Sequence, residues 1–385
     1  MTVWAELVGQ EPVVEILKSA VEGAGSQLRR EGGGSMTHAW LFTGPPGSGR
    51  SNAAGAFAAA LQCPDGGCGE CKSCITAHAG SHPDITLIRT EGLSIGTDTA
   101  REYVRKASLH PSQGRWQVLI VEDADRLTDQ AANALLKAIE EPPPRTVWML
   151  CAPAIEDVII TIRSRSRAVL LRTPPAAAIA RLLIERDQIP AELATAAAAA
   201  SQGHIGRARA LAVNPEVRQR RQVILNLPLS LRDIGDCLAA AAAINDAATA
   251  RAAEIADDAN ARELDDIRTA WGVEERGRRP AGYAGALSAL EKDQKRRRTR
   301  LMRDSIDGVL LDLMALYRDV LAVQQAPGAA LINADFVDGI NEIARLGTAE
   351  STLQHIDAIL ECREAIATNA APLLALERMM MGLVN

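Results

Sequence analysis

A glycine-rich loop between a short apolar run and an alanine-rich segment constrains the fold of this chain more than any other feature. The loop, GPPGSGRS at residues 44–51, follows the apolar residues 39–43 and precedes a helix-forming stretch through Leu61. It fits the phosphate-loop pattern G-x-x-x-x-G-K-[ST], except that Arg50 stands where the pattern has lysine. A strand, a glycine loop and a helix in this order predict a phosphate-binding loop at one edge of a parallel sheet.

The chemistry of this loop depends on backbone and side chains in different ways. Loop N–H groups beside Gly44, Gly47 and Gly49 and the following helix N-terminus can hold phosphates whatever the side chains are. Arg50 keeps the positive charge of lysine, but its planar fork places the donors differently. Ser51 could still bind magnesium. The sequence therefore permits ATP or ADP with Mg²⁺ in this loop and argues against efficient hydrolysis.

Acidic residues follow a second apolar run, at residues 118–121. Glu122, Asp123 and Asp125 come directly after this run, where a hydrolytic phosphate-loop protein places carboxylates that hold Mg²⁺ and orient water. The alternative is a buried strand that ends in a solvated acidic turn. In combination with the glycine loop, the carboxylates indicate the second half of a degenerate nucleotide site.

The order of apolar and helical patterns predicts three regions. Another apolar run at 146–151 adds a strand to an α/β domain over residues 1–172, with three layers and a mostly parallel sheet. Strand patterns then disappear. Residues 173–213 predict a small helical domain, and residues 214–385 an all-helical domain with a strongly charged insertion at about 250–305.

Four cysteines lie close together at residues 63–74. Cys63, Cys68, Cys71 and Cys74 are spaced by five, three and three residues among glycines, which favours a closed tetrahedral zinc knuckle. An iron–sulfur cluster and free thiols are the alternatives, although ferredoxin-type clusters take a distant fourth cysteine. The other three cysteines are expected to be apolar fillers: Cys151, Cys237 and Cys362.

Charge and hydropathy narrow the function classes. The net charge of −6 excludes a uniformly basic nucleic-acid binder, so phosphate contact requires a local patch. One basic run, KRRRTR at 295–300, could touch DNA phosphate, or it could be a solvated helix face. No run of 18 apolar residues and no signal-peptide pattern is present, so we expect a cytoplasmic protein without membrane contact.

Four segments together resemble the bacterial DNA polymerase III clamp loader, a family of AAA+ ring-opening machines. They are HAWLFTGPPGSGRS (38–51), HPD (82–84), DQAANALLKAIEEPP (129–143) and TIRSRS (161–166). The resemblance covers residues 1–175. It implies an AAA+ domain, a helical lid and a helical collar for oligomerisation. It also implies structural zinc and these partners: gamma/tau motor subunits, delta, the sliding clamp, and primer-template DNA reached through the complex.

Several departures from the motor subunits of this family cluster at one site. Motor subunits carry Asp-Glu where this chain has Glu122-Asp123, and a sensor threonine where Ala152 and Pro153 offer no hydroxyl. Arg207 lies near the position of the lid's sensor arginine but one residue out of register. With the missing loop lysine, these departures favour the stationary delta-prime type of subunit, which hydrolyses no ATP. An active motor subunit is the alternative, and a standalone DNA-binding factor is a third hypothesis.

An arginine in the segment RSRSR has a different implied role. The family's S-R-C motif supplies an arginine finger to the ATP of the adjacent subunit, and residues 164–166 here read Ser-Arg-Ser. The resemblance therefore makes Arg165 the catalytic finger in trans, because such an arginine neutralises charge on the transferring phosphate. Taken alone, the arginine would be interpreted as a solvated surface residue, and Arg163 and Arg167 flank it.

Overall fold

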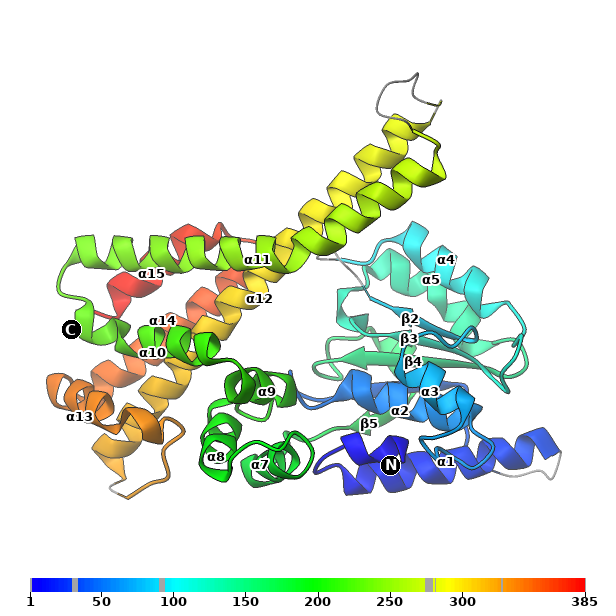
Figure 1. Ribbon diagram of the computed structural model, residues 1–385, viewed down its shortest axis with the longest axis horizontal. Coiled ribbons are helices and arrows are strands. Elements are labelled where there is room, and N and C mark those ends of the chain that lie inside the picture. The colour runs from blue at the N-terminus through cyan, green and yellow to red at the C-terminus, as the bar shows by residue number, and fades with distance from the viewer. Residues whose placement is uncertain are drawn as a thin grey trace. The chain divides into compact units, whose positions relative to one another are not determined.

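A computed structural model of the chain contains two compact units, Met1–Ala212 and Val213–Asn385, which are described separately (Figure 1). The residues that the structure describes are 2–29, 34–89, 94–273, 280, 282–326 and 328–384.

The first unit alternates strands and helices. Its strands are β1 Ala39–Thr43, β2 Ile85–Ile88, β3 Gln117–Val121, β4 Thr146–Ala152 and β5 Arg167–Leu170. Its α-helices are α1 Glu11–Arg29, α2 Arg50–Gln62, α3 Lys72–His78, α4 Thr97–Ala107, α5 Asp129–Glu140, α6 Ile160–Arg163, α7 Ala176–Glu185, α8 Ala191–Ala200 and α9 Ile205–Val213. Short 3₁₀ turns, η1 Val3–Glu6 and η2 Ala124–Arg126, complete the described elements.

The five strands form one parallel sheet in the order β2-β3-β4-β1-β5. The three strands expected from the sequence are its central members, and every residue of these three strands is buried. The two edge strands, β2 and β5, were not predicted from the sequence. Leu87 on β2 is 40% exposed and Leu170 on β5 is 68% exposed, so neither strand has the continuous apolar run of a buried one.

Helices cover both faces of the sheet, which confirms the three-layer prediction (Figure 1). Alternate residues of β1 point to opposite sides, as the pleat requires. Trp40 and Phe42 join the core with α1 and α2, where Phe57 packs edge-on against Trp40 at a ring distance of 4.9 Å. Leu41 joins the core on the other face with α4 and α5, including Leu135. The glycine loop therefore lies at the carboxyl edge of a fully covered sheet.

The helices α7 to α9 belong to the first compact unit. An ion pair between Arg186 after α7 and Glu6 in η1 closes to 2.8 Å. Gln10 joins the segment before α7 to the glycine loop, because its amide donates to the carbonyls of Arg172 at 2.6 Å and Ser48 at 3.3 Å. The separate lid domain at residues 173–213 stays a prediction, and residues 173–212 belong to the same compact unit as the sheet.

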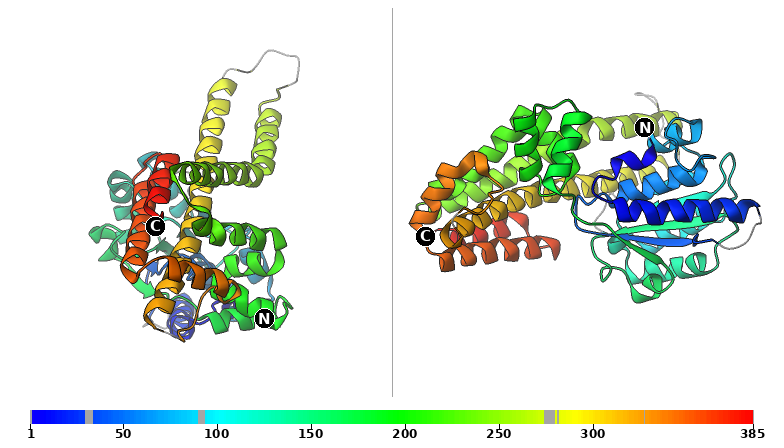
Figure 2. Two further views of the ribbon diagram at one scale, coloured as in Figure 1. Left: turned by 90° about the vertical axis from the view of Figure 1, so that its left-hand side faces the viewer. Right: turned by 90° about the horizontal axis from the view of Figure 1, so that it is seen from below.

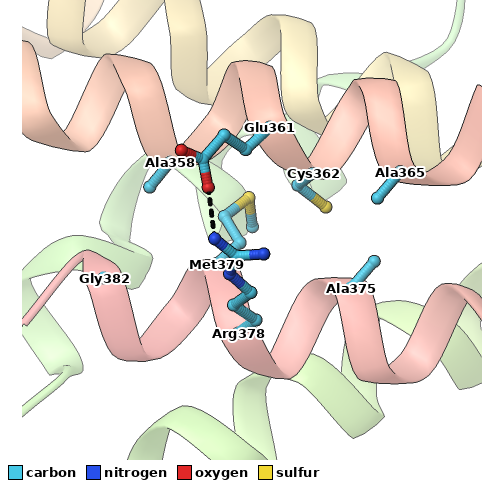
Figure 3. Close-up of a pocket in the computed structure, with 8 residues that line it drawn as sticks. All are labelled: Ala358, Glu361, Cys362, Ala365, Ala375, Arg378, Met379 and Gly382. Carbon is cyan, nitrogen blue, oxygen red and sulfur yellow. Dashed lines mark hydrogen bonds and ion pairs between the residues drawn. The ribbon is translucent and has the colours of Figure 1, made fainter.

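The second unit is helical throughout its described residues. It contains α10 Pro215–Ser230, α11 Ile234–Ala270, α12 Tyr283–Gln325, η3 Ala334–Phe336, α13 Val337–Leu346, α14 Ala349–Ala367 and α15 Pro372–Gly382. Leu225, Ile244, Leu313, Ile359 and Leu376 share its core. A groove between α14 and α15 is bridged by the ion pair of Arg378 with Glu361 at 2.6 Å (Figure 3). The remaining residues around the groove are mostly small: Ala358, Cys362, Ala365, Ala375, Met379 and Gly382.

The charged segment 250–305 lies in the far halves of α11 and α12, which extend as a pair beyond the other helices of this unit (Figures 1 and 2). Its residues 274–279 and 281 are outside the described part. Ala248, Ala252 and Ala256 are buried at four-residue spacing, and such small side chains allow the two helices to approach closely.

The basic run on α12 is largely committed to this helix pair. Arg297 pairs with Glu263 at 2.6 Å and Arg298 with Asp257 at 2.7 Å, both on α11. The guanidinium of Arg296 lies 3.3 Å from Asp293 one turn earlier. These contacts favour the helix-face interpretation of residues 295–300 over a dedicated DNA-binding patch. None of the helices in the described residues is both long and apolar enough to span a membrane.

Candidate functional site

The glycine loop joins β1 to α2 as the sequence predicts. Gly47 and Gly49 have φ angles of 83° and 89°, a region that suits glycine, and Gly49 is the residue before the first turn of α2. A side chain at Gly47 would lie 2.6 Å from Cβ of His204, in the turn between α8 and α9. The N–H of Gly44 donates to the carbonyl of Pro153 at 3.1 Å. The loop is therefore held between the end of β4 and the α8–α9 turn.

Two polar side chains in the loop are buried without a hydrogen-bond partner among the described residues. They are the hydroxyl of Ser48, a residue only 3% exposed, and one terminal nitrogen of Arg50. Leaving a buried donor unsatisfied costs about 1–3 kcal/mol, and more for a charged group. Ser48 and Arg50 flank Gly49, the residue before the first turn of α2, and a helix N-terminus favours an anion. This edge of the sheet can thus hold phosphate oxygens.

The carboxylates after β3 lie at the same edge of the sheet, but one of them is already paired. Glu122 accepts from Arg89, the residue after β2, at 2.6 Å and 3.3 Å, so both carboxylate oxygens are occupied. Asp123 lies 4.0 Å from Arg126. Sequence reasoning missed Arg89. The sequence does contain a basic residue directly after β2, but its position beside the end of β3 is apparent only once β2 is recognised as a strand.

Asp125 is the third acidic candidate, and it lies in η2. Burial raises the pKa of its carboxyl group, and the charge of Asp123 adds to this effect. The positive charges of Arg126 and Arg50 oppose it. The charge of Arg50 therefore acts on the acidic turn, and the shared nucleotide site stays a prediction.

The positions expected to sense phosphate are filled differently from a hydrolytic site. Ala152 ends β4 and is buried, and the carbonyl of the next residue, Pro153, accepts from the N–H of Gly44. Neither residue has a side-chain hydroxyl. Arg207 lies in the first turn of α9, where its N–H donates to Nδ1 of His204 at 3.2 Å. The out-of-register position of the lid arginine stays a prediction.

Arg165 lies between α6 and β5 and is exposed. Its guanidinium pairs with Glu140 at 3.2 Å and donates to the carbonyl of Thr161 at 3.0 Å. Arg167 differs, because it stacks over Trp40 at 5.0 Å and donates to a backbone carbonyl, which commits it to the fold. Arg163 donates to a carbonyl at 3.4 Å. Arg165 is thus the central arginine of the segment. A surface ion pair holds its guanidinium, which can therefore be released.

The four clustered cysteines come together as predicted. Their sulfur atoms all lie within 4.8 Å of one another, with Cys63 and Cys68 at 3.6 Å and Cys71 and Cys63 at 3.8 Å. Tetrahedral zinc–sulfur bonds of about 2.3 Å place two sulfurs about 3.8 Å apart, so the arrangement fits a metal ion. Cys74 lies in the first turn of α3. Backbone N–H groups point at three sulfurs, at 3.4 to 3.5 Å.

The surroundings of the thiols differ in a way that suits shared metal ligation. Burial opposes ionisation of Cys63, but N–H groups of Cys68, Gly67 and Asp65 outweigh it and lower the pKa of this thiol to about 7. Burial raises the pKa of Cys74. A cation bound among the four would favour the thiolate form of each. These residues can therefore hold a metal ion, and no open position for substrate is expected in a four-sulfur site.

The HPD segment before β2 has a structural role in this chain. The carboxylate of Asp84 is 2% exposed and accepts from the N–H and hydroxyl of Ser112 at 2.6 Å and 2.8 Å. Its other oxygen accepts from the N–H groups of Gln113, at 2.9 Å, and Gly114. Nδ1 of His82 in turn accepts from the N–H of Asp84 at 3.1 Å. Asp84 therefore fixes the turn that leads into β3.

Known proteins share sequence with the first unit. A model of the family described as "DNA polymerase III, delta subunit" matches residues 26–175. The gamma/tau subunit of DNA polymerase III from Mycobacterium tuberculosis is 34% identical over 185 residues, which are 47% of this chain and 30% of the relative. The delta' subunit from Escherichia coli is 36% identical over 214 residues, 54% of this chain and 64% of the relative.

A delta' subunit from Bacillus subtilis is 30% identical over 191 residues, 49% of this chain and 55% of the relative. A solved gamma subunit-related protein from Thermotoga maritima overlaps 93% of this chain and 97% of its own at 14% identity, with a TM-score of 0.40. The chain spans less than two thirds of the length of each of these curated relatives. The matched segment contains the glycine loop, the cysteine cluster and Arg165. The chain is therefore similar, over residues 26–175, to the DNA polymerase III delta family and to delta' subunits of DNA polymerase III.

Proposed function

We propose that this chain is a delta'-like, non-hydrolysing subunit of a clamp loader, which helps to place a sliding clamp on primed DNA. Its partners would be gamma/tau motor subunits, a delta subunit and the clamp, with primer-template DNA reached through the complex, in the cytoplasm. The matched family model is described as a delta subunit of DNA polymerase III, and delta' subunits are among the relatives of this chain. Three regions would divide the work: an AAA+ domain at 1–172, a lid at 173–213 and a collar at 214–385.

The observation that carries the proposal is the state of the chain's own nucleotide site. Arg50 replaces the lysine that reaches the phosphates, and Arg89 occupies both oxygens of Glu122. Ala152 and Pro153 supply no hydroxyl toward the phosphate. A site without lysine, available carboxylate and hydroxyl has lost several of the electrostatic contributions on which phosphoryl transfer depends.

Arg165 would act at the neighbour's site. The exposed guanidinium is held by an ion pair with Glu140 and by a hydrogen bond to the carbonyl of Thr161. The ion pair contributes little stability, because exposed pairs are worth about 0–1 kcal/mol. Its release for a phosphate on an adjacent subunit would therefore cost little. When the motor subunit hydrolyses its bound ATP, the guanidinium would neutralise the charge that develops on the γ-phosphate.

The test is a clamp loader assembled with the Arg165→Ala chain. We expect hydrolysis at the adjoining site to fall by about 10³-fold or more, the usual effect of removing an arginine finger. Arg163→Ala is the matched control, since this neighbour donates only to a carbonyl at 3.4 Å. Normal assembly with normal single-turnover hydrolysis in the Arg165→Ala complex would refute the finger assignment.

An active motor subunit is the second candidate, because the gamma/tau relative matches the same region at 34% identity. The two candidates differ in one measurement on the purified chain. A motor would hydrolyse ATP and lose that activity on Arg50→Ala. The stationary subunit would show no turnover above a preparation without protein.

A further inference from the structure

The N-terminal segment, residues 2–10, is anchored at the cysteine cluster. The N–H of Val3 donates to the carbonyl of Gly67 at 3.1 Å, and the indole N–H of Trp4 donates to the carbonyl of Gly66 at 3.3 Å. Both carbonyls belong to the turn between the first two cysteines of the cluster. A metal ion that joins the four sulfurs would therefore fix the turn to which this segment is bonded.

The fit between the segment and this turn is tight at Gly67. Its φ angle is 108°, and a Cβ there would lie 2.6 Å from Cγ2 of Val3 and 3.1 Å from the indole nitrogen of Trp4. Trp4 is only 7% exposed and packs into the same core as Leu7. The contact therefore requires glycine, and a side chain at this position would push the segment away from the turn.

The other end of the segment holds the stretch of chain that leads into α7. The side chain of Gln10, a residue 2% exposed, donates to the carbonyl of Arg172 at 2.6 Å and accepts from the N–H of the same residue at 3.2 Å. Glu6 pairs with Arg186, directly after α7, at 2.8 Å. The segment thus joins the turn of the cysteine cluster to both ends of α7.

We propose that residues 2–10 form a strap that transmits the metal occupancy of the cysteine cluster to the helix α7. With a metal ion bound, the turn at 66–67 holds the start of the strap, and the strap holds residues 172–186. Without the ion the turn loosens, the strap loses its anchor, and α7 opens more often. The inference goes beyond the clamp-loader role, because it gives the metal ion an effect on a helix that supplies none of its ligands.

Hydrogen exchange of the full chain, measured by mass spectrometry, tests the strap. Zinc-loaded protein is compared with protein that a chelator has stripped under reducing conditions and with the same protein after reloading. Stripping should speed exchange at residues 2–10 and 172–186 by about fivefold or more, the factor that one typical hydrogen bond contributes, and reloading should reverse this change. Exchange in the central strands β3 and β4 should stay unchanged.

Two variants separate the strap from the metal ion itself. Gly67→Ala should speed exchange at 172–186 in protein that still contains zinc. Gly80→Ala is its control, because Gly80 also has a positive φ, 68°, but nothing lies within 4 Å of an added Cβ. Gln10→Ala breaks only the far end of the strap, so it should speed exchange at 172–186 and leave nothing for stripping to add there. If Gly67→Ala loses its zinc, the response of Gln10→Ala decides.

Unchanged exchange at 172–186 after stripping would overturn the inference. Faster exchange throughout β3 and β4 would also overturn it, because the metal ion would then support the whole unit and not the strap. A further increase on stripping the Gln10→Ala chain would show that the effect reaches α7 by another route, which is equally fatal to the strap. None of these results bears on the clamp-loader role, which the Arg165→Ala complex tests separately.

Discussion

Replacing Asp84 by asparagine tests the structural role of the HPD segment. The carboxylate accepts four hydrogen bonds, two on each oxygen, from residues 112–114. Asparagine keeps the shape but turns one oxygen into an NH₂ group, which then faces two donors. Two bonds to a charged group are lost, at about 1.5–3 kcal/mol each. We therefore expect the free energy of unfolding to fall by about 3–6 kcal/mol, out of a typical total of about 5–15 kcal/mol.

Tryptophan fluorescence during urea unfolding measures this change in the correct unit. Four of the five tryptophans, Trp4, Trp40, Trp116 and Trp148, lie in the first compact unit. The control is the substitution of Asp98, whose side chain is 98% exposed. If both variants unfold within about 0.5 kcal/mol of the unaltered chain, the usual range for surface substitutions, the role assigned to Asp84 is wrong.

The same variant carries a pH signature. Burial raises the pKa of Asp84, but the N–H groups of Ser112, Gln113 and Gly114 outweigh it and leave the pKa below its ordinary value. The stabilisation is therefore complete above the unfolded pKa of about 3.9 and is lost as the pH falls through the folded pKa. The difference between the two chains should be constant from pH 7 to about pH 5 and should shrink in stronger acid.

Three further predictions concern other parts of the molecule. Metal analysis should find one zinc per chain and no iron–sulfur absorbance, and Cys71→Ser should lose the zinc and lower the melting temperature; metal-free, fully folded protein would exclude the site. His355 is 5% exposed, and burial lowers its pKa, so the free energy of unfolding should fall as the pH drops below about 6.5. In the His355→Phe chain the free energy of unfolding should depend less on pH between about pH 5 and 7. An unchanged pH dependence in this variant would contradict the prediction. Gly47→Ala should lower the melting temperature, because its Cβ would lie 2.6 Å from Cβ of His204 at a φ of 83°; an unchanged value would show that the contact is soft.

The sequence predicted the interior of the first unit well because burial on both faces leaves a plain signal. Residues 39–43, 118–121 and 146–151 are continuous apolar runs, and each is a central strand. The edge strand β2 reads Ile-Thr-Leu-Ile, and only its last residue is fully buried. A four-residue run of mixed burial has no distinctive period, so the edges of the sheet could be found only from pairing in three dimensions.

The candidate site shows a similar division between local and non-local information. The cysteine cluster is predictable because all its ligands lie within twelve residues, and spacing alone limits the geometry. Arg89 is separated from Glu122 by 33 residues, and the two meet only because β2 and β3 are parallel neighbours. The inverted order Glu122-Asp123 therefore reported a changed site but not its cause. The ion pair between Arg89 and Glu122 becomes visible only once these two strands are paired.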